Sequence, residues 1–295
     1  MIKITIGCSG AGKSTWSHEQ WKQDPLNTII VNKDKIRELL FGYTEESVTE
    51  YYRNPNNGKL EKQVTLYEDK LIEVALSMGK TVIVDATHLR KEYLDRFKIF
   101  NVKTECVVFY EDLEVLLERN KNRVRQVPEE VIKKQVQQLK SLNVPMFIEP
   151  IEFNNSRTSK DICYIIDIDG TVAEKGDRNA FDWKRVGEDK EIPEVVQTVL
   201  DLYSANNKII FCSGRDEVCR EETKKWLHEI FVGMDFELYM RPQGDMRPDW
   251  IVKEEMWREI SENYYISALI DDRDQVVRRA RALGLTVMQV NYGSF

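Results

Sequence analysis

Short apolar runs alternate with amphipathic stretches along the first 140 residues. The apolar runs are short and rich in Ile and Val, which is typical of buried strands. They lie at residues 2–7, 28–32, 81–87 and 105–110. Helical patterns lie after "GKST", at 59–78 and at 113–123. Gly79 is the expected stop of the second pattern. This alternation predicts a parallel sheet with helices on both faces.

The alternation is interrupted between residues 141 and 160, where Pro145, Pro150 and a polar Asn/Ser/Thr cluster occur together. It then restarts with a second set of elements and a polar insertion at 173–191. Strands are predicted at 162–167, 208–212, 236–240, 267–271 and 285–290, and helices from Pro193 and at 216–230, 249–261 and 274–283. A chain of 295 residues accommodates two such domains. We therefore predict two α/β domains, residues 1–150 and 151–295.

Composition excludes several classes of protein. The apolar runs are far shorter than the roughly 20 residues that span a bilayer, and the first residues lack the pattern of a secretory signal. The five cysteines are scattered without metal-ligand spacing, so we expect reduced thiols. These features predict a soluble, cytoplasmic protein.

The net charge of −7 is unevenly distributed. Residues 1–150 contain 23 basic and 22 acidic residues, whereas residues 151–295 contain 20 and 28. This balance argues against wrapping of long nucleic acid, which requires many neutralised phosphates. It leaves open a local basic patch that grips the end of a strand.

The stretch "GCSGAGKS" at residues 7–14 fits G-x-x-x-x-G-K-[ST] and lies between a predicted strand and a predicted helix. In such loops the backbone N–H groups wrap phosphates, the lysine neutralises β- and γ-phosphate charge, and the hydroxyl binds Mg²⁺. The candidate nucleotide-binding residues are Gly7, Gly10, Gly12, Lys13, Ser14 and Thr15. The first domain is therefore predicted to bind a phosphate donor.

Five further polar residues are candidates for the same site. "NKDKIR" provides Asp34, a base for an attacking hydroxyl, and Arg37, a ligand for an acceptor phosphate. "DATH" provides Asp85 at a strand end, and "RNKNRVR" places Arg119 and Arg123 four apart on one predicted helical face, as in a lid over phosphates. Each has a structural alternative: an N-cap for Asp34, a strand-end cap for Asp85 and a solvated basic face for the arginines.

The second domain opens with "DIDGT", in which Asp167 and Asp169 follow an apolar strand and precede a sharp turn. One carboxylate of such a pair attacks phosphorus and the other protonates the leaving oxygen, so a cation is required nearby. Matching groups follow later strands. They are Ser213, Gly214 and Arg215 in "SGR", Lys253 in "VKEE", and Asp271 and Asp272 in "IDDR", which suit Mg²⁺. Each motif alone also fits an ordinary strand-end turn.

These motifs, in this order, resemble the bacteriophage-type polynucleotide 5′-kinase/3′-phosphatases, which join a P-loop kinase domain to a phosphatase domain of the haloacid dehalogenase superfamily. The resemblance covers essentially the whole chain. It implies an N-terminal P-loop sheet and a C-terminal Rossmann-like sheet, with ATP and Mg²⁺ as cofactors. It also implies that strand ends of RNA or DNA are the substrates, and that a nucleic-acid ligase acts next in the cytoplasm, the host's if a phage encodes the protein. A homo-oligomer is left open.

The resemblance also implies roles for individual residues. In the kinase half, Lys13 and Ser14 bind ATP and Mg²⁺, Asp34 is the general base, Arg37 and Asp85 bind the acceptor, and Arg119 and Arg123 bind ATP. In the phosphatase half, Asp167 is the nucleophile, Asp169 the general acid/base and Lys253 its charge partner. The phosphate-binding set is Arg178, Ser213, Gly214, Arg215 and Asp249, and the Mg²⁺ set is Asp167, Asp169, through its carbonyl, Asp271 and Asp272.

Two positions depart from the family pattern. Lys33 stands where an arginine is expected beside the general base. Any contact with the nucleic-acid backbone there is therefore made by a compact ammonium charge instead of a forked guanidinium. The altered motif around Asp85 leaves its role open. Two alternative functions also remain: a fused small-molecule kinase and sugar or nucleotide phosphatase, and a non-catalytic protein that binds strand ends.

Overall fold

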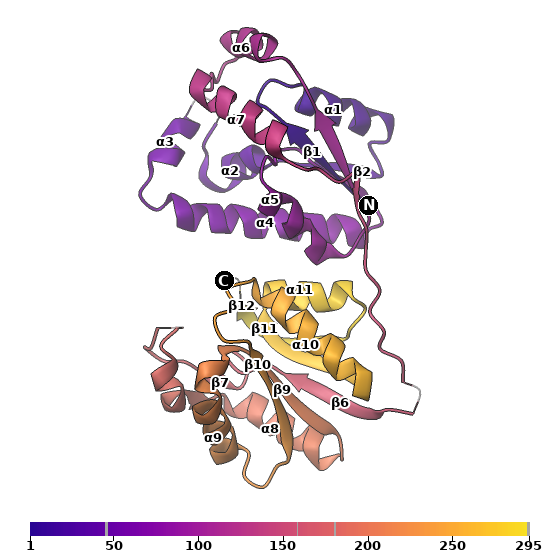
Figure 1. The fold of residues 1–295 in the computed structure, drawn as a ribbon, viewed down its shortest axis with the longest axis vertical. Coiled ribbons are helices and arrows are strands. Elements are labelled where there is room, and N and C mark those ends of the chain that lie inside the picture. The colour runs from indigo at the N-terminus through magenta and orange to yellow at the C-terminus, as the bar shows by residue number, and fades with distance from the viewer. Residues whose placement is uncertain (45–46, 158, 180, 294–295) are drawn as a thin grey trace. The chain divides into compact units, whose positions relative to one another are not determined.

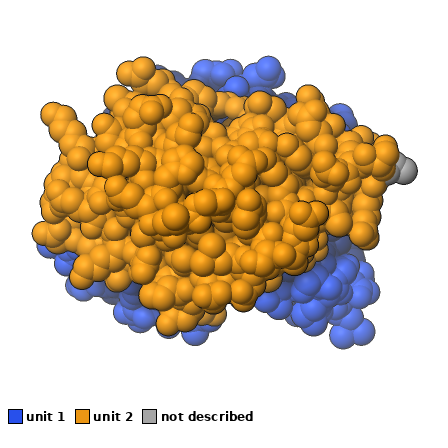
Figure 2. Space-filling view, turned by 90° about the horizontal axis from the view of Figure 1, so that it is seen from below, with its two compact units in different colours: residues 1–150 blue, residues 151–295 orange. Residues whose placement is uncertain are grey.

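The computed structural model describes residues 1–44, 47–157, 159–179 and 181–293 of the chain (Figure 1). The chain divides into two compact units, Met1–Pro150 and Ile151–Phe295, which Figure 2 colours blue and orange. Each unit contains its own five-stranded sheet. The prediction of a mixed α/β chain with two sheets is therefore confirmed.

The sheet of the first unit has the order β2-β3-β1-β4-β5, in which the first four strands are parallel and β5 pairs antiparallel with β4. The strands are β1 Ile2–Gly7, β2 Thr28–Val31, β3 Thr81–Val84, β4 Thr104–Phe109 and β5 Phe147–Ile148. In β3, the consecutive residues Val82, Ile83 and Val84 are all fully buried. Because neighbouring side chains of a strand point to opposite faces, both faces of this sheet are covered.

Helices connect these strands and cover the sheet. They are α1 Lys13–Gln23, α2 Lys33–Phe41, α3 Val48–Arg53, α4 Asn57–Ser77, α5 Lys91–Asp95, the 3₁₀ turn η1 Arg96–Phe100, α6 Leu113–Lys121 and α7 Glu129–Ser141. The helix predicted at 59–78 is α4. The strand predicted at 81–87 ends at Val84. The Asp85 N–H still donates to the Val31 carbonyl at 2.9 Å, and the Asn32 side chain donates to the Asp85 carbonyl at 3.0 Å. Helix α7 and strand β5 lie where no element was predicted.

The sheet of the second unit is entirely parallel, with the order β10-β9-β6-β11-β12. The strands are β6 Asp161–Ile166, β9 Lys208–Asp216, β10 Phe236–Arg241, β11 Tyr264–Arg273 and β12 Val287–Gly293. Strand β6 is central, and the chain builds first on one side of it and then on the other. This places the topological switch point, where open α/β sheets bind ligands, at the carboxyl end of β6.

Alternation along β6 divides the core of the second unit into two layers. Cys163 and Ile165 pack into one buried cluster, and Ile166 into the other. The first cluster is completed by α10 Asp249–Asn263 and α11 Asp274–Ala282, and the second by α8 Pro193–Ser204 and α9 Arg220–Ile230. Every second residue of β6 therefore packs on the same helix layer, which sets its register.

The remaining elements of the second unit lie in or near its loops. They are β7 Ala173–Glu174, the 3₁₀ turn η2 Trp183–Glu188, β8 Lys190–Glu191 and the 3₁₀ turn η3 Glu217–Cys219. The predicted polar insertion thus contains a short antiparallel pair, β7 with β8. Strands β9 and β11 run further than predicted, to Asp216 and Arg273, so they carry the polar motifs at their ends.

Among the residues that the structure describes, no helix combines the length and apolar character needed to cross a membrane.

Candidate active sites

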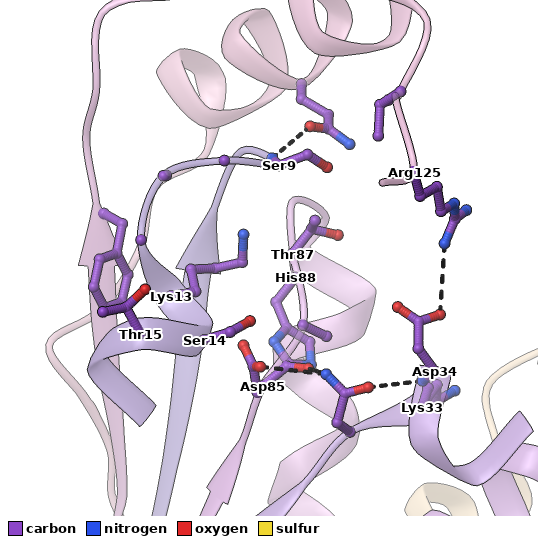
Figure 3. Close-up of a pocket in the computed structure, with 18 of the residues that line it drawn as sticks. Ser9, Lys13, Ser14, Thr15, Lys33, Asp34, Asp85, Thr87, His88 and Arg125 are labelled. Atoms are coloured by element: carbon purple, nitrogen blue, oxygen red, sulfur yellow. Dashed lines mark hydrogen bonds and ion pairs between the residues drawn. The ribbon is translucent and has the colours of Figure 1, made fainter. Parts of the chain in front are cut away.

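A glycine-rich loop joins β1 to α1 in the first unit (Figure 3). Gly12, just before the helix, has φ 93°, a left-handed conformation that favours glycine. Gly7 ends β1 against β4, where an added Cβ would lie 2.8 Å from the Phe109 carbonyl oxygen. Gly10 also has a positive φ, of 87°. The loop thus has the conformation by which backbone N–H groups surround a phosphate.

Lys13 and Ser14 open α1 at the end of this loop. The Lys13 ammonium is buried and donates to the Cys8 carbonyl at 2.7 Å. Burial lowers the pKa of Lys13 to about 8, although the charge of Asp85 opposes this shift. Ser14 and Asp85 point toward one another at the base of the loop (Figure 3). A phosphate would give the buried Lys13 ammonium a partner charge that the carbonyl cannot provide.

Asp34 lies in the first turn of α2, and the helix is capped by another residue. The Asn32 side chain accepts from the Asp34 and Lys35 N–H groups, so the alternative of Asp34 as N-cap does not hold. Asp34 instead accepts from the Arg37 guanidinium at 2.6 Å, and its side chain remains 54% exposed. It is therefore an accessible carboxylate beside a cation.

Arg37 is held by a partner that the sequence did not indicate. Its Nε donates to Glu61 of α4 at 2.7 Å, and the Tyr51 hydroxyl donates to the same oxygen at 2.9 Å. Burial opposes the charge of Arg37, but Glu61, Tyr52 and Asp34 raise its pKa. The guanidinium is thus fixed between Glu61 and Asp34.

Asp85 is buried immediately after β3. Its carboxylate accepts from Asn32 at 3.2 Å and from the Thr5 hydroxyl at 3.4 Å. Asp85 therefore joins the end of β3 to the residue that caps α2. A strand-end cap would bond only to nearby backbone groups.

The predicted shared helical face of Arg119 and Arg123 is wrong. Helix α6 ends at Lys121, and Arg123 lies in the turn after it. The Asn120 side chain holds this turn together. Its amide donates to the Val127 carbonyl at 2.8 Å and accepts from the Val127 N–H at 2.9 Å. Arg119 donates to the Gly10 carbonyl at 3.0 Å, so it contacts the glycine-rich loop directly.

One cavity of about 1240 Å³ brings these groups together. Its lining contains every predicted residue of the kinase half except Gly7: Gly10, Gly12, Lys13, Ser14, Thr15, Asp34, Arg37, Asp85, Arg119 and Arg123. A pocket for one drug-sized ligand usually has a volume of about 300–1,000 Å³, so this cavity can hold both a donor and an acceptor.

Several residues of the cavity differ from the prediction or were missed. Lys33 turns toward α4, donates to the Thr65 hydroxyl at 2.7 Å and lies 3.6 Å from Glu68, so its charge is already partnered. Gln135 of α7 accepts from the Ser9 N–H at 2.8 Å. Nothing in the local sequence indicated Gln135, which lies 126 residues from Ser9. The Arg125 side chain points toward Asp34 (Figure 3), and its guanidinium nitrogen lies 3.9 Å from an Asp34 oxygen. Arg125 belongs to the basic sequence "RNKNRVR", from which only Arg119 and Arg123 were selected.

The second site lies at the carboxyl end of β6. Lys253 of α10 is fully buried, and its ammonium donates to Asp167 at 2.7 Å and to Asp271 at 2.8 Å. Burial opposes the charge on Lys253, but the surrounding carboxylates raise its pKa well above its usual value. The predicted nucleophile thus has the predicted lysine as its charge partner.

Asp167, Asp271 and Asp272 form a cluster of buried carboxylates, with one oxygen from each within 4.8 Å of the others. Burial, together with nearby carboxylates, raises the pKa of Asp167 to about 7 and that of Asp272 to about 6. Three hard oxygen ligands that repel one another form a set that fits Mg²⁺. Gly170, with φ 81°, allows this approach, since a Cβ there would lie 2.4 Å from an Asp272 oxygen.

Asp169 has different partners from Asp167. Arg215 donates to both of its oxygens at 2.9 Å, and Arg178 donates to one at 2.9 Å. Although burial acts in the opposite direction, these arginines hold the pKa of Asp169 below its usual range. Strand β6 ends at Ile166, so strand alternation does not direct the two carboxylates. The pKa of Asp167 is thus raised and that of Asp169 lowered, whereas a nucleophile must be ionised and a general acid protonated. The implied roles therefore need a cation that keeps Asp167 ionised and a substrate phosphate that draws Arg178 and Arg215 away from Asp169.

Asp189, which the sequence did not single out, orients both arginines. It accepts two bonds from Arg178, at 2.6 and 2.7 Å, and one from Arg215 at 2.6 Å. Its own side chain is 1% exposed. Asp189 lies in the polar insertion, where acidic residues are common, so no local signal distinguished it.

Asp249, Ser213 and Gly214 complete the site. Asp249, the first residue of α10, is buried and pairs with Arg241 at 2.8 Å and Arg273 at 3.1 Å. Ser213 is fully buried and its hydroxyl accepts from the Arg215 N–H at 3.1 Å. Gly214 lies against Asp249, where an added Cβ would be 2.5 Å from Oδ1. The predicted residues of this half are therefore brought together around one strand end.

We predict that Gly214→Ala lowers the free energy of unfolding by about 1–3 kcal/mol, because the new methyl group displaces a carboxylate fixed by two arginines. Urea titration measures this change. Gly187→Ala is the matched control, since a Cβ at Gly187 meets nothing within 4 Å. Its expected effect is within about 0.5 kcal/mol. Equal stability of the two variants would contradict the close approach of Gly214 to Asp249.

A second prediction concerns His88, which is buried and donates from Nδ1 to the Thr5 carbonyl at 2.8 Å. Burial lowers its pKa to about 4, so the unfolded chain binds a proton before the folded chain does. Stability is therefore lost as pH falls from about 6.5 to 4, by about 3 kcal/mol in total. His88→Asn keeps a donor and tolerates the positive φ.

The wild type and His88→Asn are compared by urea unfolding at several pH values between 7 and 4. The variant should lose less stability than the wild type over this range, and the difference should grow as pH falls. A difference that does not change with pH would contradict a neutral buried imidazole.

Two ranges of the chain match known protein families. Residues 161–295 match the family of the phosphatase domain of the polynucleotide kinase PNKP, and residues 2–142 match an AAA domain family.

Two curated relatives are also similar. A bifunctional polynucleotide kinase/RNA ligase of Autographa californica nuclear polyhedrosis virus is 29% identical over 289 residues, which is 94% of this chain and 40% of the relative. An L-seryl-tRNA(Sec) kinase of Methanococcus maripaludis is 32% identical over 142 residues, which is 45% of this chain and 50% of the relative. The chain thus spans half or less of the length of these relatives.

Among solved structures, a chain of the Pnkp1/Rnl/Hen1 RNA repair complex is 27% identical, with a TM-score of 0.46, over 100% of this chain and 96% of that chain. The resemblance predicted from the motifs is confirmed by the two family matches: residues 161–295 match the family of polynucleotide kinase phosphatase domains, and residues 2–142 match an AAA domain family.

Proposed function

We propose that the protein heals broken nucleic-acid strands at both ends. The first unit phosphorylates a 5′-hydroxyl end with ATP as donor, and the second unit removes a 3′-phosphate. The observation that carries this proposal is that one chain contains, in its two units, a cavity lined by the glycine-rich loop and Asp34 and a buried cluster of Asp167, Lys253 and Asp271. Both arrangements suit a phosphate group. The phosphatase family matched by residues 161–295 supports a polynucleotide substrate.

In the first unit, ATP occupies the glycine-rich loop and its phosphates contact Lys13 and Arg123. Asp34 accepts the proton of the attacking hydroxyl, and Arg37 binds a phosphate of the acceptor strand. The exposure of Asp34 and the fixed orientation of Arg37 support these roles. The hydroxyl oxygen attacks the γ-phosphorus as the bond to the β-phosphate oxygen breaks, so ADP leaves.

In the second unit, the Asp167 carboxylate attacks the 3′-phosphate as the bond from phosphorus to the 3′-oxygen breaks. Asp169, which takes up a proton from solvent once Arg178 and Arg215 turn to the substrate phosphate, gives that proton to the leaving 3′-oxygen. Water then attacks the aspartyl phosphate, gives its proton to Asp169 and releases inorganic phosphate. Arg178 and Arg215, which Asp189 orients, exchange Asp169 for oxygens of the substrate phosphate. Lys253 balances the charge of Asp167 throughout.

Mg²⁺ fits both sites. Asp167, Asp271, Asp272 and the carbonyl of Asp169 would hold it in the second unit, and Ser14 in the first. When bound, it neutralises charge on the phosphates and on the carboxylates that surround them. The products, a 5′-phosphate and a 3′-hydroxyl, are the ends that a ligase joins, so a ligase is the expected next enzyme. We infer a cytoplasmic site of action on RNA or DNA ends.

The proposal predicts two separable activities on one oligonucleotide with 5′-hydroxyl and 3′-phosphate ends, in the presence of ATP and Mg²⁺. Asp34→Ala should lose 5′ phosphorylation by about 100-fold or more and keep 3′ release, because only the base is removed. Asp167→Ala should do the reverse. Electrophoresis and mass spectrometry of the product ends measure both.

The matched controls are Asp95→Ala in the first unit and Asp235→Ala in the second. Both residues make surface ion pairs, with Lys98 and Lys208 respectively, so both activities should be unchanged. If the wild type modifies glycerol, nucleosides or sugar phosphates but neither end of the oligonucleotide, the small-molecule alternative replaces the proposal. If it binds the oligonucleotide and changes neither end, the non-catalytic alternative does.

A further inference from the structure

Tyr52 is an aromatic side chain in the cavity of the first unit that no catalytic role explains. It lies on α3 and lines the cavity, and it is 48% exposed, whereas its neighbour Tyr51 is fully buried. A half-exposed aromatic ring that lines a charged cavity is available to contact a ligand bound there.

Tyr52 is held beside the residues that surround Asp34. The Tyr51 ring meets it edge-on, with centroids 5.4 Å apart. The Arg37 and Arg125 guanidinium carbons each lie 5.5 Å from the Tyr52 centroid. The same two arginines reach the Asp34 carboxylate, at 2.6 and 3.9 Å. The ring is therefore located within a few ångströms of the groups that would bind the attacking hydroxyl and its nearest phosphates.

Rings and cations in this arrangement suit a single-stranded nucleic acid. Cationic groups follow its phosphates, and aromatic rings stack on its bases without regard to base identity. A flexible polyol has no planar π system on which such a ring can stack. Lys33, which precedes Asp34 in the chain, bonds to Thr65 and lies near Glu68, so its ammonium already has partners.

We propose that Tyr52 determines the acceptor specificity of the kinase site: its ring stacks on one of the first two nucleobases behind the 5′-hydroxyl. This inference rests on the proposed 5′-kinase function. It names Tyr52 as the residue that lets the site prefer a polynucleotide over a small hydroxyl compound.

Another structural role for Tyr52 must be distinguished from stacking. The ring also supports the Arg37 and Arg125 guanidinium groups, so its loss could disturb the phosphate grip on any acceptor. A stacking role depends on the presence of the bases, whereas a supporting role does not. An acceptor without bases separates the two.

The experiment measures kcat and KM for 5′ phosphorylation of two oligonucleotides by the wild type, Tyr52→Ala and Tyr52→Phe. One oligonucleotide carries all its bases, and the other has abasic tetrahydrofuran units at its first two positions. Stacking contributes about 1–3 kcal/mol per base. Tyr52→Ala should therefore raise the KM of the base-bearing acceptor about tenfold, with the KM of ATP unchanged. Tyr52→Phe, which keeps the ring, should match the wild type.

On the abasic acceptor, the wild type and Tyr52→Ala should have equal KM values. Tyr67→Ala is the matched control, because Tyr67 is 40% exposed on α4 and lies outside the described lining of the cavity. A Tyr52→Ala penalty of equal size on both acceptors would overturn the stacking role. If the wild type phosphorylates no oligonucleotide, the proposed function itself fails, which is a different outcome.

Discussion

A parallel sheet that is covered on both faces has room for charged groups only at its strand ends. In β3 three successive residues, 82–84, are fully buried, and in β6 successive residues enter two different apolar clusters. Charged side chains cannot be accommodated within such strands without a large desolvation cost. Both sites therefore form where β1 and β6 end, and the helix layers that create this constraint also supply Lys13, Asp34 and Lys253.

The two sites meet this constraint in different ways. The phosphatase site buries its charges and compensates them in pairs, Lys253 with Asp167 and Asp271, and Arg215 with Asp169 and Asp189. Removing one partner of such a pair leaves an uncompensated buried charge, which usually costs about 3–5 kcal/mol. The kinase site is an open cavity in which Asp34 stays half exposed. The charged side chains of the second unit are thus held more firmly in place, and those of the first unit are more accessible to a ligand.

Much of the fold was predictable because its pattern is local. Alternation of short apolar runs with amphipathic stretches indicated both sheets, and a glycine-rich loop between a strand and a helix is recognisable without the rest of the chain. Two of the errors occur where a side-chain contact beyond the next turn overrides the local pattern. Asn120 bonds to Val127 and ends α6 before Arg123, and the Asp85 side chain, just after β3, bonds with Asn32. Helix α7 was missed altogether.

The sequence by itself determined which chemical groups are present and in what order, and hence the two domain families and the candidate Lys13, Asp34, Asp167 and Asp169. Only the tertiary structure decided what each group touches. Glu61 holds Arg37 from 24 residues away, and Gln135 reaches Ser9 across 126 residues. Lys33 bonds to Thr65 of α4, and Asp189 joins Arg178 to Arg215. Such pairs form because packing of the helix layers brings residues together that are far apart in the sequence. The spacing of residues along the chain does not indicate these contacts.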